Sequence, residues 1–256
     1  MKIRVLGAHN TESKNTKCLC LLVDRIFALD AGGLTSSLAF RQQVKIQAVF
    51  LTHAHYDHIR DIPAFAMNLY LHRKSVDIYT HQAARDNLVK YFLNGELYPE
   101  FQNRPADNPT LRIHILEPYQ KVNLSGYEIM AVPVNHKLPG VGYQIISPER
   151  KTIFYTGDTG GGLIEPWKKI FPQTLFIELT ALNRWEESMQ HNGHLTSKLL
   201  KQELVNFRDL KGYLPDIVTI HMNPADESRI KSELKTVSGS LGVSIRMANE
   251  GMQIQV

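Results

Sequence analysis

Short apolar segments with the alternation or β-branched content of strands open the chain and recur along its whole length. Turn-forming residues separate most of them, as expected between strands. The predicted strands are 2–7, 18–24, 26–33, 46–52, 76–80, 111–117, 121–124, 127–136, 141–147, 152–158, 174–180, 216–221, 244–248 and 252–256.

Amphipathic segments lie between these strands, with predicted helices at 34–43, 58–74, 82–93, 165–171, 194–210 and 225–237. Pro63 fits only the first turn of its helix, and Thr196 can cap the helix that begins near it. Residues 94–110 are rich in turn formers and predict a long loop. Because there is no repeat, linker or break in composition, we expect one α+β domain over residues 1–256, with helices packed outside mixed sheets.

The composition, 43% hydrophobic and 21% charged, is that of an ordinary globular protein rather than a disordered or membrane protein. We recognise no signal peptide at the N-terminus and expect a cytoplasmic protein without a membrane partner. The net charge of +4 neither requires nor excludes a nucleic-acid partner. Cys18 and Cys20 are expected to be reduced core residues on one face of a strand.

The segment THAHYDH, directly after the apolar strand 46–52, contains four potential metal ligands: His53, His55, Asp57 and His58. In extended chain, residues two apart point the same way, so His53 and His55 can reach one ion. Asp57 and His58 follow where a helix begins, and can face a second ion. Imidazole and carboxylate ligands suit zinc, and also manganese or iron.

Three further candidates end predicted strands elsewhere in the chain: His136, Asp158 and His221. Each follows an apolar run and precedes turn-forming residues. With the motif they make seven ligands, which suits two metals that share a carboxylate and a water. We therefore expect two divalent transition-metal ions as cofactors, with Zn²⁺ as first choice and Mn²⁺ or Fe²⁺ as alternatives.

Together, THAHYDH, TGDT around Asp158, and FALDAGG around Asp30 resemble the metallo-β-lactamase superfamily. The resemblance implies a four-layer αββα sandwich with the metals at one edge of both sheets. It assigns one metal to His53, His55 and His136, the other to Asp57, His58 and His221, and a bridging role to Asp158. Asp30 is implied to orient the ligand loop, although a simple turn residue is the alternative reading.

Other segments resemble the phosphodiesterase branch of that superfamily. VNHKLPGVGY is similar to a region shared with ribonuclease Z. FIELTALNRWEESMQHNGHLTSKLLKQEL and KYFLNGELYPEF resemble class II cyclic-nucleotide phosphodiesterases. Asp61-Ile62 stands where that family has Gly-Leu, and the opening segment lacks the usual double glycine, so the substrate stays open.

The implied reaction is hydrolysis of a 3′,5′-cyclic nucleotide, a small-molecule phosphodiester, to the 5′-nucleotide. A hydroxide bridging two metals would attack phosphorus in line with the departing ribose oxygen. His194 would protonate that oxygen, with Glu178 as its orienting partner. Asp57 counts with these two as catalytic, in addition to its role as a ligand.

Three alternatives remain. A tRNA 3′-end endonuclease of the ribonuclease Z kind makes RNA the second choice of partner, because we find no basic Gly/Pro-rich arm. A non-catalytic binding module should have lost ligands, yet all seven are present. A lactonase or thiolester hydrolase could use the same metals. The sequence leaves open whether the protein forms a homodimer. Three aromatic residues could either stack on a nucleobase or cover an edge of the core: Tyr98, Phe101 and Trp185.

Overall fold

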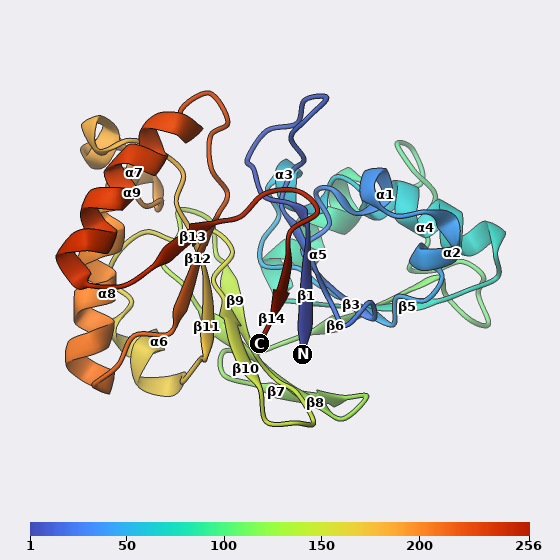
Figure 1. Ribbon diagram of the computed structural model, residues 1–256. Helices are drawn as coiled ribbons and strands as arrows, with labels where there is room; N and C mark the ends of the chain where they lie inside the picture. Colours follow the sequence, from blue (N-terminus) through green and yellow to red (C-terminus); the bar gives the residue numbers. More distant parts are fainter.

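The computed structural model describes residues 1–256 and contains two seven-stranded sheets that lie face to face (Figure 1). The first sheet has the order β14 (Gln253–Gln255), β1 (Lys2–Gly7), β2 (Cys20–Val23), β3 (Phe27–Leu29), β4 (Ala48–Phe50), β5 (Val76–Thr80) and β6 (Leu111–Ile115). The second has the order β13 (Ile245–Met247), β12 (Asp216–Ile220), β11 (Thr174–Glu178), β10 (Thr152–Tyr155), β9 (Val141–Ile146), β8 (Tyr127–Pro133) and β7 (Lys121–Leu124).

Helices cover the outer face of each sheet (Figure 1). On the first sheet these are α1 (Leu34–Ser37), α2 (Phe40–Gln43), α3 (Tyr56–Ile59), α4 (Ile62–Leu71) and α5 (Gln82–Tyr91). On the side of the second sheet are α6 (Ile164–Lys169), the 3-10 turn η1 (Asn183–Trp185), α7 (Glu186–Asn192), α8 (Ser197–Lys211) and α9 (Glu227–Leu241). The predicted αββα sandwich is therefore confirmed.

The space between the sheets is filled by a cluster of 25 buried hydrophobic residues from both sheets. Strand alternation places Ile3 and Val5 of β1 in this cluster, where each is fully buried. Aromatic rings join the two layers, because Phe50 of β4 packs against Tyr143 of β9 with ring centroids 5.4 Å apart. The two sheets consequently share one apolar core.

Two predicted helices are each interrupted. The segment 34–43 forms α1 and α2, which are separated by extended backbone at Leu38 and Ala39. The segment 58–74 breaks between α3 and α4 because Ala31 exchanges backbone hydrogen bonds with it. The Ala31 N–H donates to the His58 carbonyl, and the Ala31 carbonyl accepts from the Asp61 N–H. Pro63 lies in the first turn of α4, as predicted.

Helix α7 was not predicted, because none of its residues is buried and it therefore has no apolar stripe. The segment 94–110 contains no helix or strand, in agreement with the predicted loop. Both cysteines are free and buried, as expected of core residues. No helix combines the length and the apolar character needed to cross a bilayer.

Candidate metal centre

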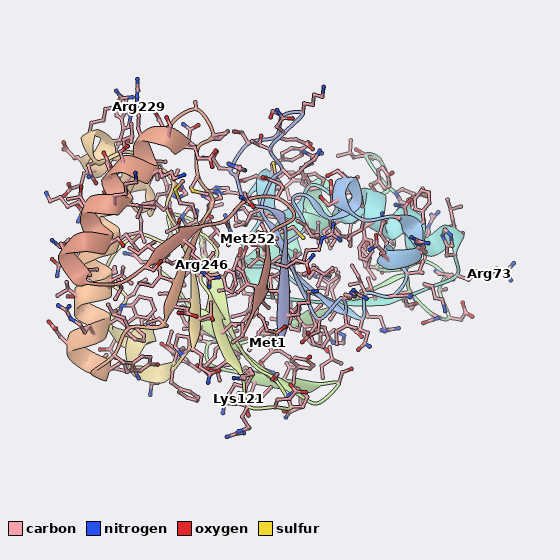
Figure 2. All side chains as sticks on the ribbon, in the orientation of Figure 1. Met1, Arg73, Lys121, Arg229, Arg246 and Met252 are labelled. Atoms are coloured by element: carbon pink, nitrogen blue, oxygen red, sulfur yellow. The ribbon has the colours of Figure 1, made fainter.

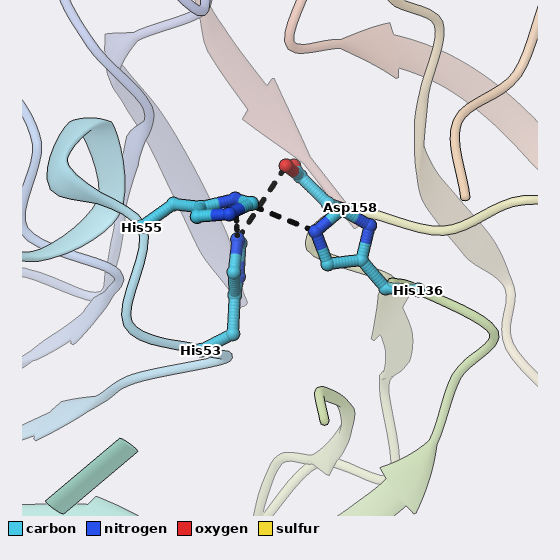
Figure 3. A group of neighbouring side chains, drawn as sticks. All are labelled: His53, His55, His136 and Asp158. Carbon is cyan, nitrogen blue, oxygen red and sulfur yellow. Dashed lines mark hydrogen bonds and ion pairs between the residues drawn. The ribbon is translucent and has the colours of Figure 1, made fainter. Parts of the chain in front are cut away.

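The first group of ligand candidates comes from three segments that meet at one edge of the sandwich. His53 and His55 follow β4, His136 follows β8, and Asp158 follows β10. The side chains point toward one another from the two sheets (Figure 3). Nδ1 of His55 lies 2.9 Å from Nε2 of His53 and 3.4 Å from Nε2 of His136. One ligand atom from each of these four residues lies within 4.8 Å of the others.

The second group lies beside the first and consists of Asp57, His58 and His221. Asp57 and His58 belong to α3, and His221 follows β12. Oδ2 of Asp57 is 3.0 Å from Nε2 of His221 and 3.6 Å from Nε2 of His58. The structure therefore brings together all seven predicted ligands, in two groups that agree with the division implied by the resemblance.

Asp158 faces both groups with different oxygens. Its Oδ2 lies 3.5 Å from Nε2 of His53, whereas its Oδ1 lies 3.1 Å from Nε2 of His58 and 3.4 Å from Nε2 of His221. Although Oδ1 of Asp158 and Nε2 of His58 lie this close, they are not aligned for a hydrogen bond, and both are buried without any other partner. Buried polar atoms normally have a partner, so these orphaned atoms fit a site that binds metal ions.

Hydrogen bonds at Nδ1 turn the opposite nitrogen, Nε2, of four histidines toward the centre. The acceptors are Thr52 for His53, Asp30 for His58, the Gly193 carbonyl for His136, and Thr180 for His221. Such bonds fix both the tautomer and the orientation of a metal-binding imidazole. His55 differs, because its Nδ1 itself faces the centre.

Asp30 is the most connected of these orienting groups and is fully buried. Its carboxylate accepts hydrogen bonds from the backbone and hydroxyl of Thr52, from Nδ1 of His58, and from the hydroxyl of Tyr155. The backbone of Asp30 adopts the left-handed region with φ 56°, and its side chain contacts the ligand loop at Thr52 and His58. This position matches the orienting role implied for Asp30.

Burial lowers the pKa values of His53, His55 and His136, so these imidazoles are neutral and free to coordinate near pH 7. Burial also disfavours the charged form of Asp57, but the nearby His58 and His221 lower its pKa to about 2. These three imidazoles and the Asp57 carboxylate thus have the protonation states that metal binding requires. Burial opposes charge on His58, but Asp158 and Asp30 raise its pKa above the usual value, so a metal ion binding there would displace a proton.

His194 and Glu178 lie next to the cluster, as the sequence suggested. Nδ1 of His194 is 2.8 Å from Oε1 of Glu178, which is fully buried. Burial disfavours the imidazolium, but the carboxylate more than offsets this and raises the pKa of His194 to about 9. The imidazole of His194 also stacks on that of His221, with ring centroids 5.6 Å apart.

Sequence reasoning missed how Glu178 connects to the second group. The hydroxyl of Thr180 donates to Oε2 of Glu178, 2.9 Å away, and accepts from Nδ1 of His221. Glu178 therefore orients two histidines: His194 directly, and the ligand candidate His221 through Thr180. The signal was the spacing, since residues 178 and 180 lie two apart at a strand end. Thr52 and Tyr155, the other missed partners, carry no comparable signal.

The aromatic residues that could stack on a nucleobase differ in their exposure to solvent. Phe101 is buried in the core beneath the helices, so it cannot stack on a base. Trp185 is 51% exposed, and the missed Tyr56, between two ligands, is 64% exposed.

The sequence pattern of the family described as β-lactamase superfamily domain matches residues 22–222, which include all seven ligand candidates. The chain belongs to this superfamily. The metallo-β-lactamase fold implies divalent metal ions, and the His/Asp cluster is of the kind that binds them. The resemblance identified from THAHYDH and TGDT is therefore confirmed.

Individual proteins resemble this chain either in sequence or in three-dimensional structure. A ribonuclease Z of Pyrococcus abyssi is 25% identical over 154 residues, which cover 58% of this chain and 48% of that protein. The chain thus spans about half the length of that relative. The structure of unliganded yeast PDE1 superposes with a TM-score of 0.86 at 16% identity, covering 100% of this chain and 99% of the other. That of the short form of human tRNase Z gives 0.71 at 18% identity, covering 100% and 99%.

Proposed function

We propose that this chain is a dinuclear metal-dependent phosphodiesterase that hydrolyses a 3′,5′-cyclic nucleotide to the 5′-nucleotide. The observation that carries the proposal is the position of Asp158, whose two oxygens face the two ligand groups. His53, His55 and His136 would hold one ion, Asp57, His58 and His221 the other, and Asp158 both. We propose Zn²⁺ as the metal, with Mn²⁺ or Fe²⁺ as alternatives, because the donors are imidazoles and carboxylates.

Two bound divalent ions would neutralise phosphate oxygens and make hydroxide available near neutral pH. The chain's own contribution is to orient the ligands and to supply a proton. His194 is 16% exposed, in contrast to Glu178, so its ring can reach a substrate at the centre. We propose that His194 protonates the departing ribose oxygen and that Glu178 holds Nδ1 so that Nε2 carries the transferred proton.

The preference for a cyclic nucleotide rests on the His194–Glu178 pair within a segment resembling class II phosphodiesterases. The second candidate, cleavage of precursor tRNA, is favoured by the relative named ribonuclease Z. We also propose that residues 1–256 act as one domain, because both sheets contribute to one core.

A panel of substrates separates these functions. The metal-loaded protein is offered cyclic AMP, cyclic GMP, precursor tRNA, bis-p-nitrophenyl phosphate and a lactone. Turnover of a cyclic nucleotide to the 5′-product is the expected result. Efficient cleavage of precursor tRNA without cyclic-nucleotide turnover would favour the second candidate, and hydrolysis of the lactone alone would contradict both.

A further inference from the structure

A cleft of about 410 Å³ lies between β1, the turn from β2 to β3, and the segment around α2. Five of the nine residues that line it are cationic: Lys2, Arg4, Arg25, Arg41 and Lys45. Lys2, at the N-terminal end of β1, lines the cleft, and Figure 2 labels the preceding residue, Met1. The other end of β1 leads to Ala8, whose carbonyl accepts the N–H of the ligand candidate His221. Lys2 is therefore about 20 Å along the strand from the metal centre.

Most of the positive charge in this cleft is not neutralised by the protein. The ion pairs of the chain involve other lysines and arginines. One carboxylate lines the cleft, that of Asp24, so it can offset only one of the five positive charges, and its two oxygens accept hydrogen bonds from neutral donors. Oδ1 accepts the backbone N–H of Lys2 at 2.7 Å, and Oδ2 accepts the hydroxyl of Tyr127 at 2.5 Å.

The arrangement is unfavourable for the chain without a bound anion. Lys2 and Arg4 extend from the same face of β1, and Arg41 of α2 and Lys45, which follows that helix, line the same cleft. Like charges therefore repel one another across it. Arg25 occupies the second position of the two-residue turn between β2 and β3, with φ 65°. Glycine or asparagine is favoured at such a position, so an arginine there indicates a use for its side chain.

We propose that this cleft binds a compact anion with two or more phosphate groups, such as pyrophosphate or the polyphosphate of a nucleoside triphosphate. Arginine forks match phosphate oxygens in pairs, and lysines add point charges. The volume is that of a small-molecule site. The adjoining cleft along β1 is less positive, because the carboxylate of Glu250 lies beside its Arg4 and Lys14, and its third cation, Lys17, pairs with Glu12. The concentration of charge in the first cleft therefore favours a compact anion over an extended nucleic acid.

The test is calorimetric titration of the metal-loaded protein with magnesium pyrophosphate, magnesium ATP and a single-stranded RNA. The variant Arg41→Ala/Lys45→Ala removes two cations from the cleft. The matched control Arg73→Ala/Lys74→Ala removes one exposed arginine and one exposed lysine from another part of the surface, where Figure 2 labels Arg73. We expect the cleft variant to bind pyrophosphate at least about tenfold more weakly than the control.

The variant Arg25→Gly makes the test independent of folding defects. Glycine suits the left-handed turn, so this variant should unfold at a Tm at least as high as that of the natural chain and still bind pyrophosphate more weakly. Binding of ATP and pyrophosphate with similar affinity would support recognition of the phosphates alone. Equal affinity of the cleft variant and the control, no binding of either phosphate compound, or binding of RNA alone would each overturn the proposal. The cleft variant and the control share the metal centre, so the difference between them isolates binding in the cleft, whatever reaction the centre catalyses.

Discussion

The variant His194→Ala separates proton transfer from metal binding. His194 pairs with Glu178 through Nδ1, and its side chain is 16% exposed, whereas those of His58 and His221 are 0% and 3% exposed. This places His194 at the rim of the ligand cluster. We therefore expect the variant to fold and to retain its metal ions.

The expected loss depends on the leaving group. A ribose alkoxide needs a proton when it departs, and a positioned general acid contributes about 10²–10⁴-fold. His194→Ala should therefore raise the barrier for a cyclic nucleotide by about 3–5 kcal/mol. A p-nitrophenolate leaves as a stable anion, so turnover of bis-p-nitrophenyl phosphate should fall by less than about tenfold. The assay compares kcat for both substrates at equal metal content.

Two outcomes would refute this reasoning. Equal losses with both substrates would mean that His194 acts on binding or transition-state charge rather than on the leaving group. Loss of a metal ion would make His194 a ligand, since one atom each from His194, Asp158 and His221 also lies within 4.8 Å of the others. The variant Glu178→Gln is a less clean probe, because Glu178 also supports His221 through Thr180.

Other predictions concern stability. Gly157→Ala should destabilise the fold by about 1–3 kcal/mol in thermal unfolding, because Gly157 has φ 60° and a Cβ there would meet Thr52 at 2.6 Å. Glu203→Ala should cost at least about 3 kcal/mol in denaturant titration, because the buried carboxylate accepts three N–H groups from 162–167. Burial alone would raise the pKa of Asp77, but the hydrogen bonds and positive charges of Arg112 and His114 lower it by more. The pKa of Asp77 in the folded protein is therefore depressed. Asp77 then stabilises the fold above its ordinary pKa of about 3.9 and loses this effect as the pH falls through the folded value. Asp77→Asn should lower Tm at pH 7, and the deficit should shrink in acid; a deficit independent of pH would contradict this.

The ligand cluster could be predicted because strand ends are visible in the sequence. His136, Asp158 and His221 each follow an apolar run, and the fold brings those ends to one edge. The division into two groups followed from the resemblance and agrees with the geometry. The break between α3 and α4 could not be predicted, because it depends on backbone hydrogen bonds with Ala31, which is distant in sequence.

The cationic cleft was also invisible in the sequence. Its residues are scattered between Lys2 and Gln253, and no run of basic residues marks it. The sheet order places β14 beside β1, and only this pairing brings Gln253 next to Arg4. Net charge alone gave no indication of where positive charge collects.

The central claim, that seven side chains hold two metal ions, is tested most directly by elemental analysis. Protein purified without chelator, offered Zn²⁺ or Mn²⁺ and then dialysed should contain about two ions per chain. The variant Asp158→Ala, which removes the carboxylate facing both groups, should contain fewer ions and lose most activity. A natural chain that retains no metal under these conditions would contradict the account.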